Sequence, residues 1–203
     1  RRILLHAVLI SGGNVIDGTG SQPQPNTDVL IEGDRIVAVG KNLVVEKSSE
    51  REVRRVDATG LTVMPGLIDA HTHITLGEPR TNDELFLHRD PATAAILAAY
   101  NVRKVLRAGV TSMFDVDGIF NIGPALRDSI KAGVVEGPTM KSGSYALMTA
   151  VGGTAGKLIP DSGTAGYAEV VRNKEETVLA VRRQVKDGAD CIKIHVTGLI
   201  PTR

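Results

Sequence analysis

The sequence has 203 residues, with 24 Lys and Arg against 23 Asp and Glu, so its formal net charge is +1. This balance provides no basic surface for nucleic acid, and no nucleic-acid partner is expected. The 42% hydrophobic and 23% charged fractions are typical of a soluble globular chain. The single cysteine excludes an internal disulfide framework and favours a reducing compartment, the cytoplasm. No stretch reaches the roughly 18 apolar residues of a membrane helix, so no membrane association is expected.

Residues 1–64 are predicted to form part of a small β-sandwich. Runs rich in β-branched residues, separated by turn residues, predict strands at 7–10, 15–16, 28–31, 35–39 and 62–63. The apolar run at 3–10 is interpreted as a strand and not as a secretory signal, because no small-x-small cleavage pattern follows it. The charged run 46–55 is expected to be a solvated loop or a sheet edge.

Residues 65–203 alternate between strand and helix patterns. Strands are predicted at 66–71, 110–116, 139–144 and 190–196, and helices at 91–108, 123–132 and 174–186. Asn173 is a good N-cap for the last helix, and Gly109, Gly133 and Gly188 follow the three helices. Repeated β-then-α units imply parallel strands with right-handed crossovers.

Two histidines stand at the end of the first of these strands, in Pro65-Gly66-Leu67-Ile68-Asp69-Ala70-His71-Thr72-His73. Residues i and i+2 of an extended chain face the same way, so His71 and His73 can bind one borderline metal such as Zn²⁺. The alternative is a polar loop with two solvated histidines. The apolar strand before the pair and the carboxylate of Asp69 favour the metal site.

The fourth strand carries a lysine within Asp190-Cys191-Ile192-Lys193-Ile194-His195-Val196. Cys191, Lys193 and His195 are expected to share one face. A lysine aimed into a barrel interior favours its neutral form, which can react with carbon dioxide to give a carbamate that bridges two metals. A salt-bridged lysine near the surface is the alternative, and it would be preferred without the histidine pair.

Together, the two motifs resemble the metal-dependent amidohydrolase superfamily, over almost the whole chain. Within it the chain resembles the imidazolonepropionase/prolidase-like branch and, more narrowly, bacterial molinate (thiocarbamate) and phenylurea hydrolases. The resemblance implies an α/β fold: residues 65–203 would form strands 1–4 of a (β/α)₈ TIM barrel, and residues 1–64 part of its β-sandwich domain. Barrel sites lie at the carboxyl ends of strands, where both motifs fall.

The resemblance also implies a site and a reaction. His71 and His73 would bind the more buried metal, and Lys193 would be the carbamylated bridging ligand. The site would hold one or two divalent ions, with Zn²⁺ expected and Co²⁺ or Mn²⁺ as alternatives. A metal-bound hydroxide would cleave an amide-like C–N or thiocarbamate bond of a small-molecule substrate. The aspartate that moves the proton in the family lies on strand 8, beyond Arg203, so no catalytic base is identified. By strand-end position alone, the substrate-binding residues would be Val116, Asp117, Tyr145 and His195.

The chain departs from the family pattern at two places. Many dipeptidase-like relatives have Gly-Gly-His-Gly after strand 3, whereas this chain has Gly152-Gly153-Thr154-Ala155-Gly156, which weakens the case for a peptide substrate. His195 stands where relatives often have a small or apolar residue. Its imidazole either contacts substrate, or supplements a site that has lost one metal, or is a hydrogen-bonded polar group in the loop.

A complete barrel needs about 250 residues, and only four of its strands are recognised here. We therefore expect this chain to be a fragment that associates with the complementary C-terminal part of the same enzyme, within a homo-oligomer. Arg203 in a loop would suit a trypsin-like nick; a split enzyme and a truncated sequence are the alternatives. A dipeptidase and a non-catalytic binding protein of the same superfamily are the competing functions. Lys193 argues against a cyclic deaminase.

Overall fold

The computed structural model describes residues 5–45, 51–77, 79–149, 159 and 161–196, and it divides the chain into two compact units, Arg1–Pro65 and Gly66–Arg203. The Gly-rich run at 152–156 and the proposed nick at Arg203 lie outside the described residues. None of the described helices is both long and apolar enough to cross a membrane.

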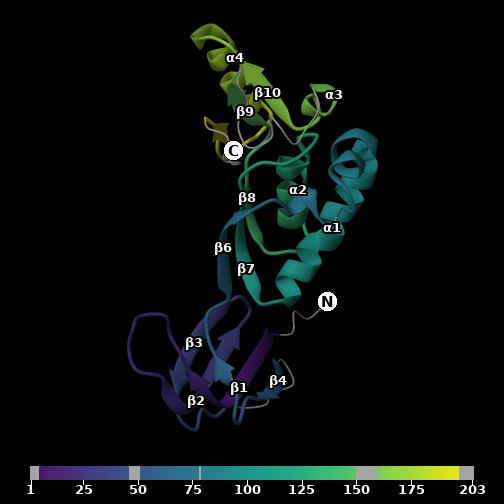
Figure 1. The fold of residues 1–203 in the computed structure, drawn as a ribbon. Coiled ribbons are helices and arrows are strands. Elements are labelled where there is room, and N and C mark those ends of the chain that lie inside the picture. Colours follow the sequence, from purple (N-terminus) through teal and green to yellow (C-terminus); the bar gives the residue numbers. More distant parts are fainter. Residues whose placement is uncertain (1–4, 46–50, 78, 150–158, 160, 197–203) are drawn as a thin grey trace, which may run out of the picture. The chain divides into compact units, whose positions relative to one another are not determined.

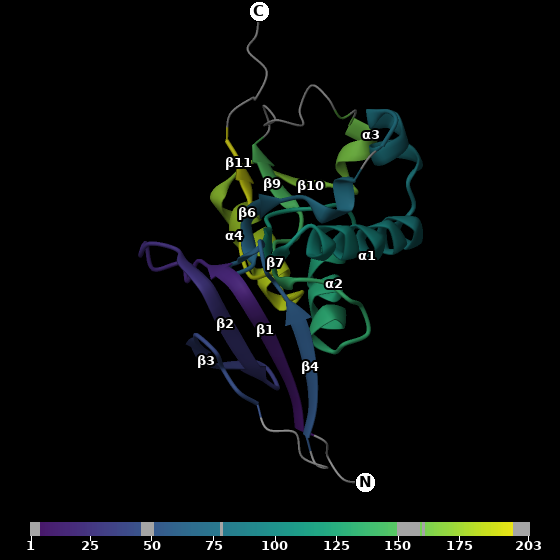
Figure 2. The same cartoon turned by 90° about the horizontal axis from the view of Figure 1, so that it is seen from below.

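The first unit contains a single five-stranded sheet (Figures 1 and 2). Its strands are β1 (Leu5–Val15), β2 (Gln24–Glu32), β3 (Arg35–Gly40), β4 (Arg51–Asp57) and β5 (Thr62–Val63). The order is β3-β2-β1-β4, with β5 paired to β1 beyond the end of β4. Strand β1 is antiparallel to β2 and parallel to β4 and β5. The expected part of a sandwich is therefore one layer in the described residues, and the edge expected within 46–55 is formed by β4.

Strand β1 is continuous where the sequence predicted two short strands, and its glycine pair explains the error. Gly12 has a φ of +73°, and the pairing of β1 with β2 shifts register on both sides of Gly13. Glycine in a strand normally weakens the prediction, but here it forms bulges that leave the strand intact. The Asp28 carboxylate stabilises this distortion by accepting hydrogen bonds from the backbone N–H of Gly12 and of Leu43, each at 2.9 Å.

The second unit begins with a parallel sheet, β6-β7-β8, formed by Leu67–Thr72, Val110–Asp115 and Thr139–Ser142. Helices α1 (Pro91–Arg107) and α2 (Ile122–Lys131) lie on the same side of this sheet in Figures 1 and 2. Ala98 and Val102 of α1, Leu126 of α2, Met113 of β7 and Met140 of β8 are buried in one core cluster. The alternation of strands and helices predicted from the sequence is confirmed for these elements.

Local signals in the sequence account for where the helices begin and end. The Asp90 carboxylate accepts hydrogen bonds from the N–H groups of Ala92 and Thr93 at the start of α1. Asn173 caps α4 (Lys174–Lys186) in the same way, as predicted. Gly109 and Gly188, which follow α1 and α4, have φ values of +93° and +90°, a conformation that glycine adopts without a steric cost.

The rest of the second unit is a parallel sheet of order β10-β9-β11, with strands Ala168–Val171, Ala146–Thr149 and Ile194–His195. Two short helical turns, η1 (Ile74–Leu76) and η2 (Glu84–His88), precede α1, and α3 (Asp161–Thr164) precedes β10. Strands β9 and β10 were not predicted, because four-residue strands carry too little periodicity to recognise. The strand expected at 190–196 was wrong in extent, since its ladder covers only β11.

Backbone hydrogen bonds connect the two small sheets of this unit into the order expected for successive barrel strands. The Asp190 N–H donates to the Ser142 carbonyl at 2.7 Å, and the Leu147 N–H donates to the Lys193 carbonyl at 2.8 Å. The segment 190–195 therefore lies beside β8 at its start and beside β9 at its end, as the fourth strand of a barrel lies beside the third. The second unit is a mixed α/β structure that is consistent with part of a TIM barrel.

We predict that Gly143→Ala lowers the free energy of unfolding by about 1–3 kcal/mol, because overpacking at a close approach costs this much. A Cβ at Gly143 would fall on the Val116 carbonyl oxygen and 3.2 Å from the Cys191 Sγ. Urea unfolding measures the change. Gly40→Ala is the matched control, because its Cβ would meet only Leu43 Cδ2, at 3.7 Å. Equal urea midpoints for Gly143→Ala and the wild type would contradict the close approach.

Candidate active site

The polar residues of the second unit gather at the carboxyl ends of β6, β7 and β8. His71 lies in β6 and His73 follows it, while Asp115 ends β7 and Asp117 comes two residues later. Parallel strands bring their carboxyl ends to one edge of the sheet, so segments distant in sequence meet there. The Val116 N–H donates to the Thr72 carbonyl at 3.2 Å, which joins the β6 and β7 ends directly.

The structure brings together the three residues that the sequence singled out for metal binding. Lys193 Nζ lies 3.3 Å from His71 Nε2, and the ring centroids of His71 and His73 are 5.2 Å apart. His71 is exposed, whereas His73 and Lys193 are partly buried. The backbone bond from Leu147 to the Lys193 carbonyl fixes the chain beside β9 and holds this lysine opposite β6.

Asp117 is fully buried at the centre of a second group of contacts, which we call the Asp117 cluster: Asp117, His73, Tyr167 and His195. Its Oδ1 lies 2.5 Å from His73 Nδ1, and its Oδ2 lies 3.0 Å from His195 Nε2. The Tyr167 hydroxyl also donates to Oδ2, at 3.2 Å.

The charges of this cluster stabilise one another. Burial alone would raise the pKa of Asp117, but the hydrogen bonds and positive charge of His73 and His195 hold it below its ordinary value. The hydrogen bond to Asp117 in turn raises the pKa of His73. Burial, together with the Asp117 charge, raises the pKa of Tyr167, so its hydroxyl stays protonated and remains a donor. The cluster is therefore a buried carboxylate in contact with two imidazoles and one hydroxyl.

Asp115 is a second buried carboxyl group, only 1% exposed, and it ties three strand ends together. It accepts hydrogen bonds from the Ile74 N–H at 2.9 Å and from the Ser142 hydroxyl at 3.2 Å. Burial is the main cause that raises the pKa of Asp115 to about 6. Two strand-end carboxyl groups spaced i, i+2 were a signal for this pair, but only Asp117 was singled out from the sequence.

The structure brings two of the four residues expected to bind substrate into contact. His195 and Asp117 are in the cluster, and the carbonyl of buried Val116 accepts from the Cys191 thiol at 3.7 Å. Burial, together with the charges of Glu169 and Asp187, raises the pKa of Tyr145. Tyr167 was missed, because nothing in the run Thr164-Ala165-Gly166-Tyr167 forms a recognisable motif.

These residues can supply part of a metal site. Among the described residues, no group of three or more His, Cys, Asp or Glu is arranged to hold a metal ion. His71 Nε2 and Lys193 Nζ nevertheless face each other at 3.3 Å, and Asp117 occupies His73 Nδ1, which leaves Nε2 as that ring's remaining ligand atom. Imidazole nitrogens suit Zn²⁺, which takes four ligands in a complete site. The donor set fits a metal but is incomplete among the residues that the structure describes.

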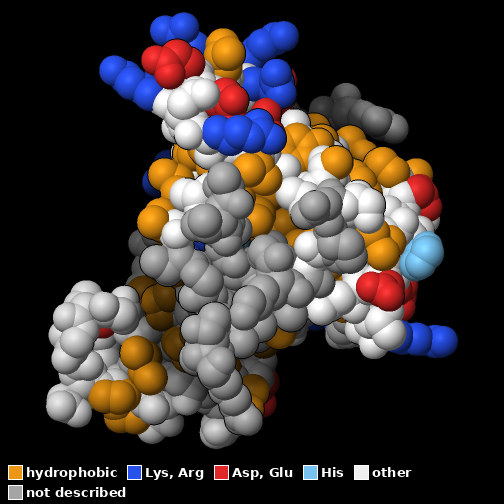
Figure 3. All heavy atoms as spheres, turned by 45° about the horizontal axis from the view of Figure 1, so that its top comes forward, with side chains coloured by type: hydrophobic (Ala, Val, Ile, Leu, Met, Phe, Trp, Pro, Cys, Tyr) orange, Lys and Arg blue, Asp and Glu red, His pale blue; other side chains and the backbone are white. Residues whose placement is uncertain are grey.

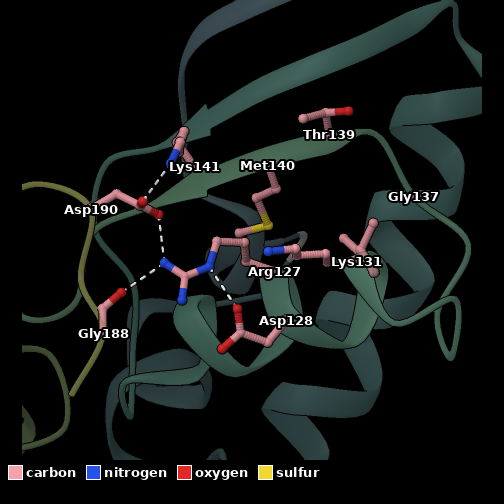
Figure 4. A pocket seen from close by; sticks show the side chains of 10 residues that line it. Arg127, Asp128, Lys131, Gly137, Thr139, Met140, Lys141, Gly188 and Asp190 are labelled. Carbon is pink, nitrogen blue, oxygen red and sulfur yellow. Dashed lines mark hydrogen bonds and ion pairs between the residues drawn. The ribbon is translucent and has the colours of Figure 1, made fainter.

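A separate cavity of about 740 Å³ is lined by residues of α2, of β8 and the chain just before it, and of the 188–190 turn (Figure 4). Asp190 is its structural centre: it binds Arg127 Nη1 at 2.6 Å, Lys141 Nζ at 2.8 Å and the Ser142 N–H at 3.0 Å. Although burial opposes it, these bonds lower the pKa of Asp190 to about 2. Neither histidine of the pair nor Lys193 lines this cavity, so we assign Asp190 the role of anchoring the segment that carries Lys193.

The second unit, with parallel strands that carry polar groups at their carboxyl edge, is consistent with part of an α/β barrel. The family model that matches is the Amidohydrolase family, over residues 62–202, and the chain belongs to this family. Ochratoxinase from Aspergillus niger is 28% identical over 211 residues, which cover 96% of this chain and 43% of that protein.

Solved structures agree with this assignment. A Xaa-Pro dipeptidase has a TM-score of 0.79 at 30% identity, over 96% of this chain and 48% of that one. Molinate hydrolase has a TM-score of 0.70 at 26% identity, over 94% and 45%. Phenylurea hydrolase B, at 24% identity and a TM-score of 0.70 over 93% and 45%, shows the shared fold. The predicted resemblance is confirmed, and the chain spans less than half the length of these relatives.

We predict that the free energy of unfolding of Asp115→Asn, relative to that of the wild type, increases as pH rises. Burial raises the folded-state pKa of Asp115 from 3.8 to about 6. The contribution of the neutral carboxyl group to the stability of the folded protein is therefore complete below pH 3.8, and it is lost as pH rises through about 6. The stability of the variant relative to the wild type should increase by about 2 kcal/mol between pH 4 and pH 7. Urea unfolding in the presence of a chelator measures this.

Asp90→Asn is the control of opposite sign. The pKa of Asp90 is lowered by hydrogen bonds from Thr93 and Ala92, so its contribution to stability is present above its unfolded pKa and lost as pH falls. Asp90→Asn should therefore lose stability relative to the wild type as pH rises. If Asp115→Asn followed the same direction as Asp90→Asn, the assignment of a raised pKa to Asp115 would be wrong.

Proposed function

We propose that the complete protein is a metal-dependent hydrolase that cleaves an amide-like C–N bond or a thiocarbamate bond of a small molecule, and that this chain supplies the N-terminal half of its active site. The observation that carries the proposal is the contact between Lys193 Nζ and His71 Nε2, with His73 beside it, at the carboxyl edge of the strands. Membership of the Amidohydrolase family supports the same conclusion.

His71, His73 and Lys193 would hold the metal, one or two divalent ions, with Zn²⁺ preferred over Co²⁺ or Mn²⁺. A metal bound there lowers the pKa of water and polarises a substrate carbonyl. The Lys193 amine, when neutral, can form an N–C bond to carbon dioxide and release one proton, which yields a carbamate oxygen ligand. This chemistry suits a partly buried lysine whose Nζ contacts an imidazole.

The substrate class rests on the relatives and on the strand-end residues. Among the similar proteins, the names of molinate hydrolase and phenylurea hydrolase B state what each of them hydrolyses. We propose a substrate of comparable chemistry for this protein. Val116 and His195 remain our candidates for substrate contact, because they lie at the edge that carries His71 and Lys193. Tyr145 and Asp117 remain candidates by strand-end position alone.

A dipeptidase is the second candidate, and the Xaa-Pro dipeptidase structure, with 30% identity and a TM-score of 0.79, favours it. The sequence Gly152-Gly153-Thr154-Ala155-Gly156 lacks the histidine found in many dipeptidase-like relatives, which argues against it. Hydrolysis of an N-aryl urea or a thiocarbamate, compared with a Xaa-Pro dipeptide, separates the two. A non-catalytic member of the family would bind no metal and turn over neither.

We also propose that the complementary C-terminal part of the same enzyme covers the exposed sheet edges of the second unit, within a homo-oligomer. Strands β6 and β11 are edge strands of their sheets. Leu67 and Ile68 of β6 are 51% and 75% exposed, and Ile194 and Val196 at β11 are 58% and 63% exposed. Hydrophobic side chains are visible across one face in Figure 3. Exposed apolar strand edges are normally covered by another element.

We predict that the purified protein binds a divalent metal and that His71→Gln or Lys193→Ala weakens binding at least about 100-fold, the upper range for loss of a supporting group. Metal content per protein and competition with a chromogenic chelator measure this. His88→Gln is the control, because His88 is exposed and lies in η2, away from these strands.

The number of metal ions bound per protein distinguishes a two-metal site from a one-metal site. Two equivalents that fall sharply in Lys193→Ala support a bridged two-metal site. One equivalent that persists in Lys193→Ala indicates a single ion held by His71 and His73. No metal bound by the wild-type protein at its natural length contradicts the proposed function.

A further inference from the structure

We propose that Asp117 is a positioning residue that holds His73 as the tautomer protonated on Nδ1, so that Nε2 keeps the lone pair that a metal ligand needs. The tautomer follows from the contacts of this chain alone. Only its use in metal binding rests on the proposed function.

The first step is the surroundings of His73 Nδ1. This nitrogen lies 2.5 Å from Asp117 Oδ1 and 3.2 Å from the Asp117 backbone carbonyl oxygen. Both atoms are hydrogen-bond acceptors, so a nitrogen between them must carry a proton. A neutral imidazole has one N–H, and its other nitrogen is then an acceptor. Protonation of Nδ1 therefore leaves Nε2 with the lone pair that a metal requires.

The second step is that Asp117 cannot easily turn away from His73. Its Oδ2 accepts from His195 Nε2 at 3.0 Å and from the Tyr167 hydroxyl at 3.2 Å, in a site where Asp117 has no exposed surface. Rotation of the carboxylate would leave buried donors without partners, at a cost of about 1–3 kcal/mol for each. The carboxylate is therefore fixed from both sides.

The third step is that His195 and Tyr167 are themselves held in place. Tyr167 is 5% exposed and packs edge to face against Phe86, with ring centroids 5.5 Å apart, and against His195, at 6.1 Å. His195 is 8% exposed and lies in β11, which pairs with β9. The extra imidazole on the fourth strand thus supports the carboxylate that orients His73, a role that its position in the sequence did not reveal.

The consequence is a measurable dependence of a metal ligand on residues that do not touch the metal. Carboxylates that hold the second nitrogen of a ligating histidine typically change metal affinity 10- to 100-fold when they are removed. Tyr167→Phe removes only one donor to Oδ2 and keeps both contacts of His73 Nδ1, with Oδ1 and with the Asp117 backbone carbonyl, so it should retain the tautomer.

The test is a long-range ¹H–¹⁵N spectrum of imidazole groups in the metal-free protein at its natural length, recorded at alkaline pH where the rings are neutral. The signals that disappear in His73→Gln identify His73. We expect Nδ1 protonation in the wild type and in Tyr167→Phe, and a weaker preference in Asp117→Ala, which keeps only the backbone carbonyl as an acceptor for Nδ1. Asp28→Asn is the matched control: it alters another buried carboxylate, in the first unit, and should leave the His73 signals unchanged.

Zn²⁺ affinity, measured by chelator competition, should fall 10- to 100-fold in Asp117→Ala and remain within about 3-fold of the wild type in Asp28→Asn. Protonation of His73 on Nε2 in the wild type would overturn the inference without any variant having to fold. Nδ1 protonation in a protein that binds no Zn²⁺ would support the positioning role and contradict the proposed function, so the two failures are distinguishable. Asp117→Ala with an unchanged tautomer would also overturn it.

Discussion

The arrangement of the candidate site depends on one buried carboxylate. Asp117 follows β7, and its oxygens contact a histidine from the end of β6, a histidine in β11 and a tyrosine that precedes β10. These four segments span more than a hundred residues of sequence, and the carboxylate joins them within hydrogen-bond distance. A charge with no exposed surface is stable only when it is paired or hydrogen-bonded, and here two imidazoles and a hydroxyl contact it. The burial of Asp117 therefore depends on the positions of the two histidines, and their positions in turn depend on Asp117.

Asp115 and Asp117 show how neighbouring carboxyl groups acquire opposite properties. Both are buried and only two residues apart, yet the pKa of Asp115 is raised to about 6 and that of Asp117 is lowered. Burial opposes the charged form of both. The difference lies in the donors: Asp115 meets a backbone N–H and a hydroxyl, whereas Asp117 meets two imidazoles that can carry positive charge. The first group joins strand ends, and the second aligns titratable side chains.

The sequence predicted the helices and the main parallel strands of the second unit because each has a local cause. Asp90 and Asn173 are N-caps, and Gly109 and Gly188 follow helix ends. The spacing of apolar residues between these signals distinguishes helix from strand. The errors also have local causes. Glycines in β1 look like a break, although they form bulges, and strands as short as β9 or β10 have no measurable period.

The candidate site was predictable to the extent that its chemistry is local in sequence. His71 and His73 are two residues apart on one strand, and Lys193 is a polar residue in an apolar alternation, so both could be recognised from their spacing. Tyr167 could not be recognised, because its role exists only through Asp117, fifty residues earlier in the chain. The role of His195 was left open for the same reason: a strand pattern gives the face of a side chain but not its hydrogen-bond partner. A histidine tautomer is the property least predictable from sequence, because it depends on acceptors that only the folded chain brings close to one ring nitrogen.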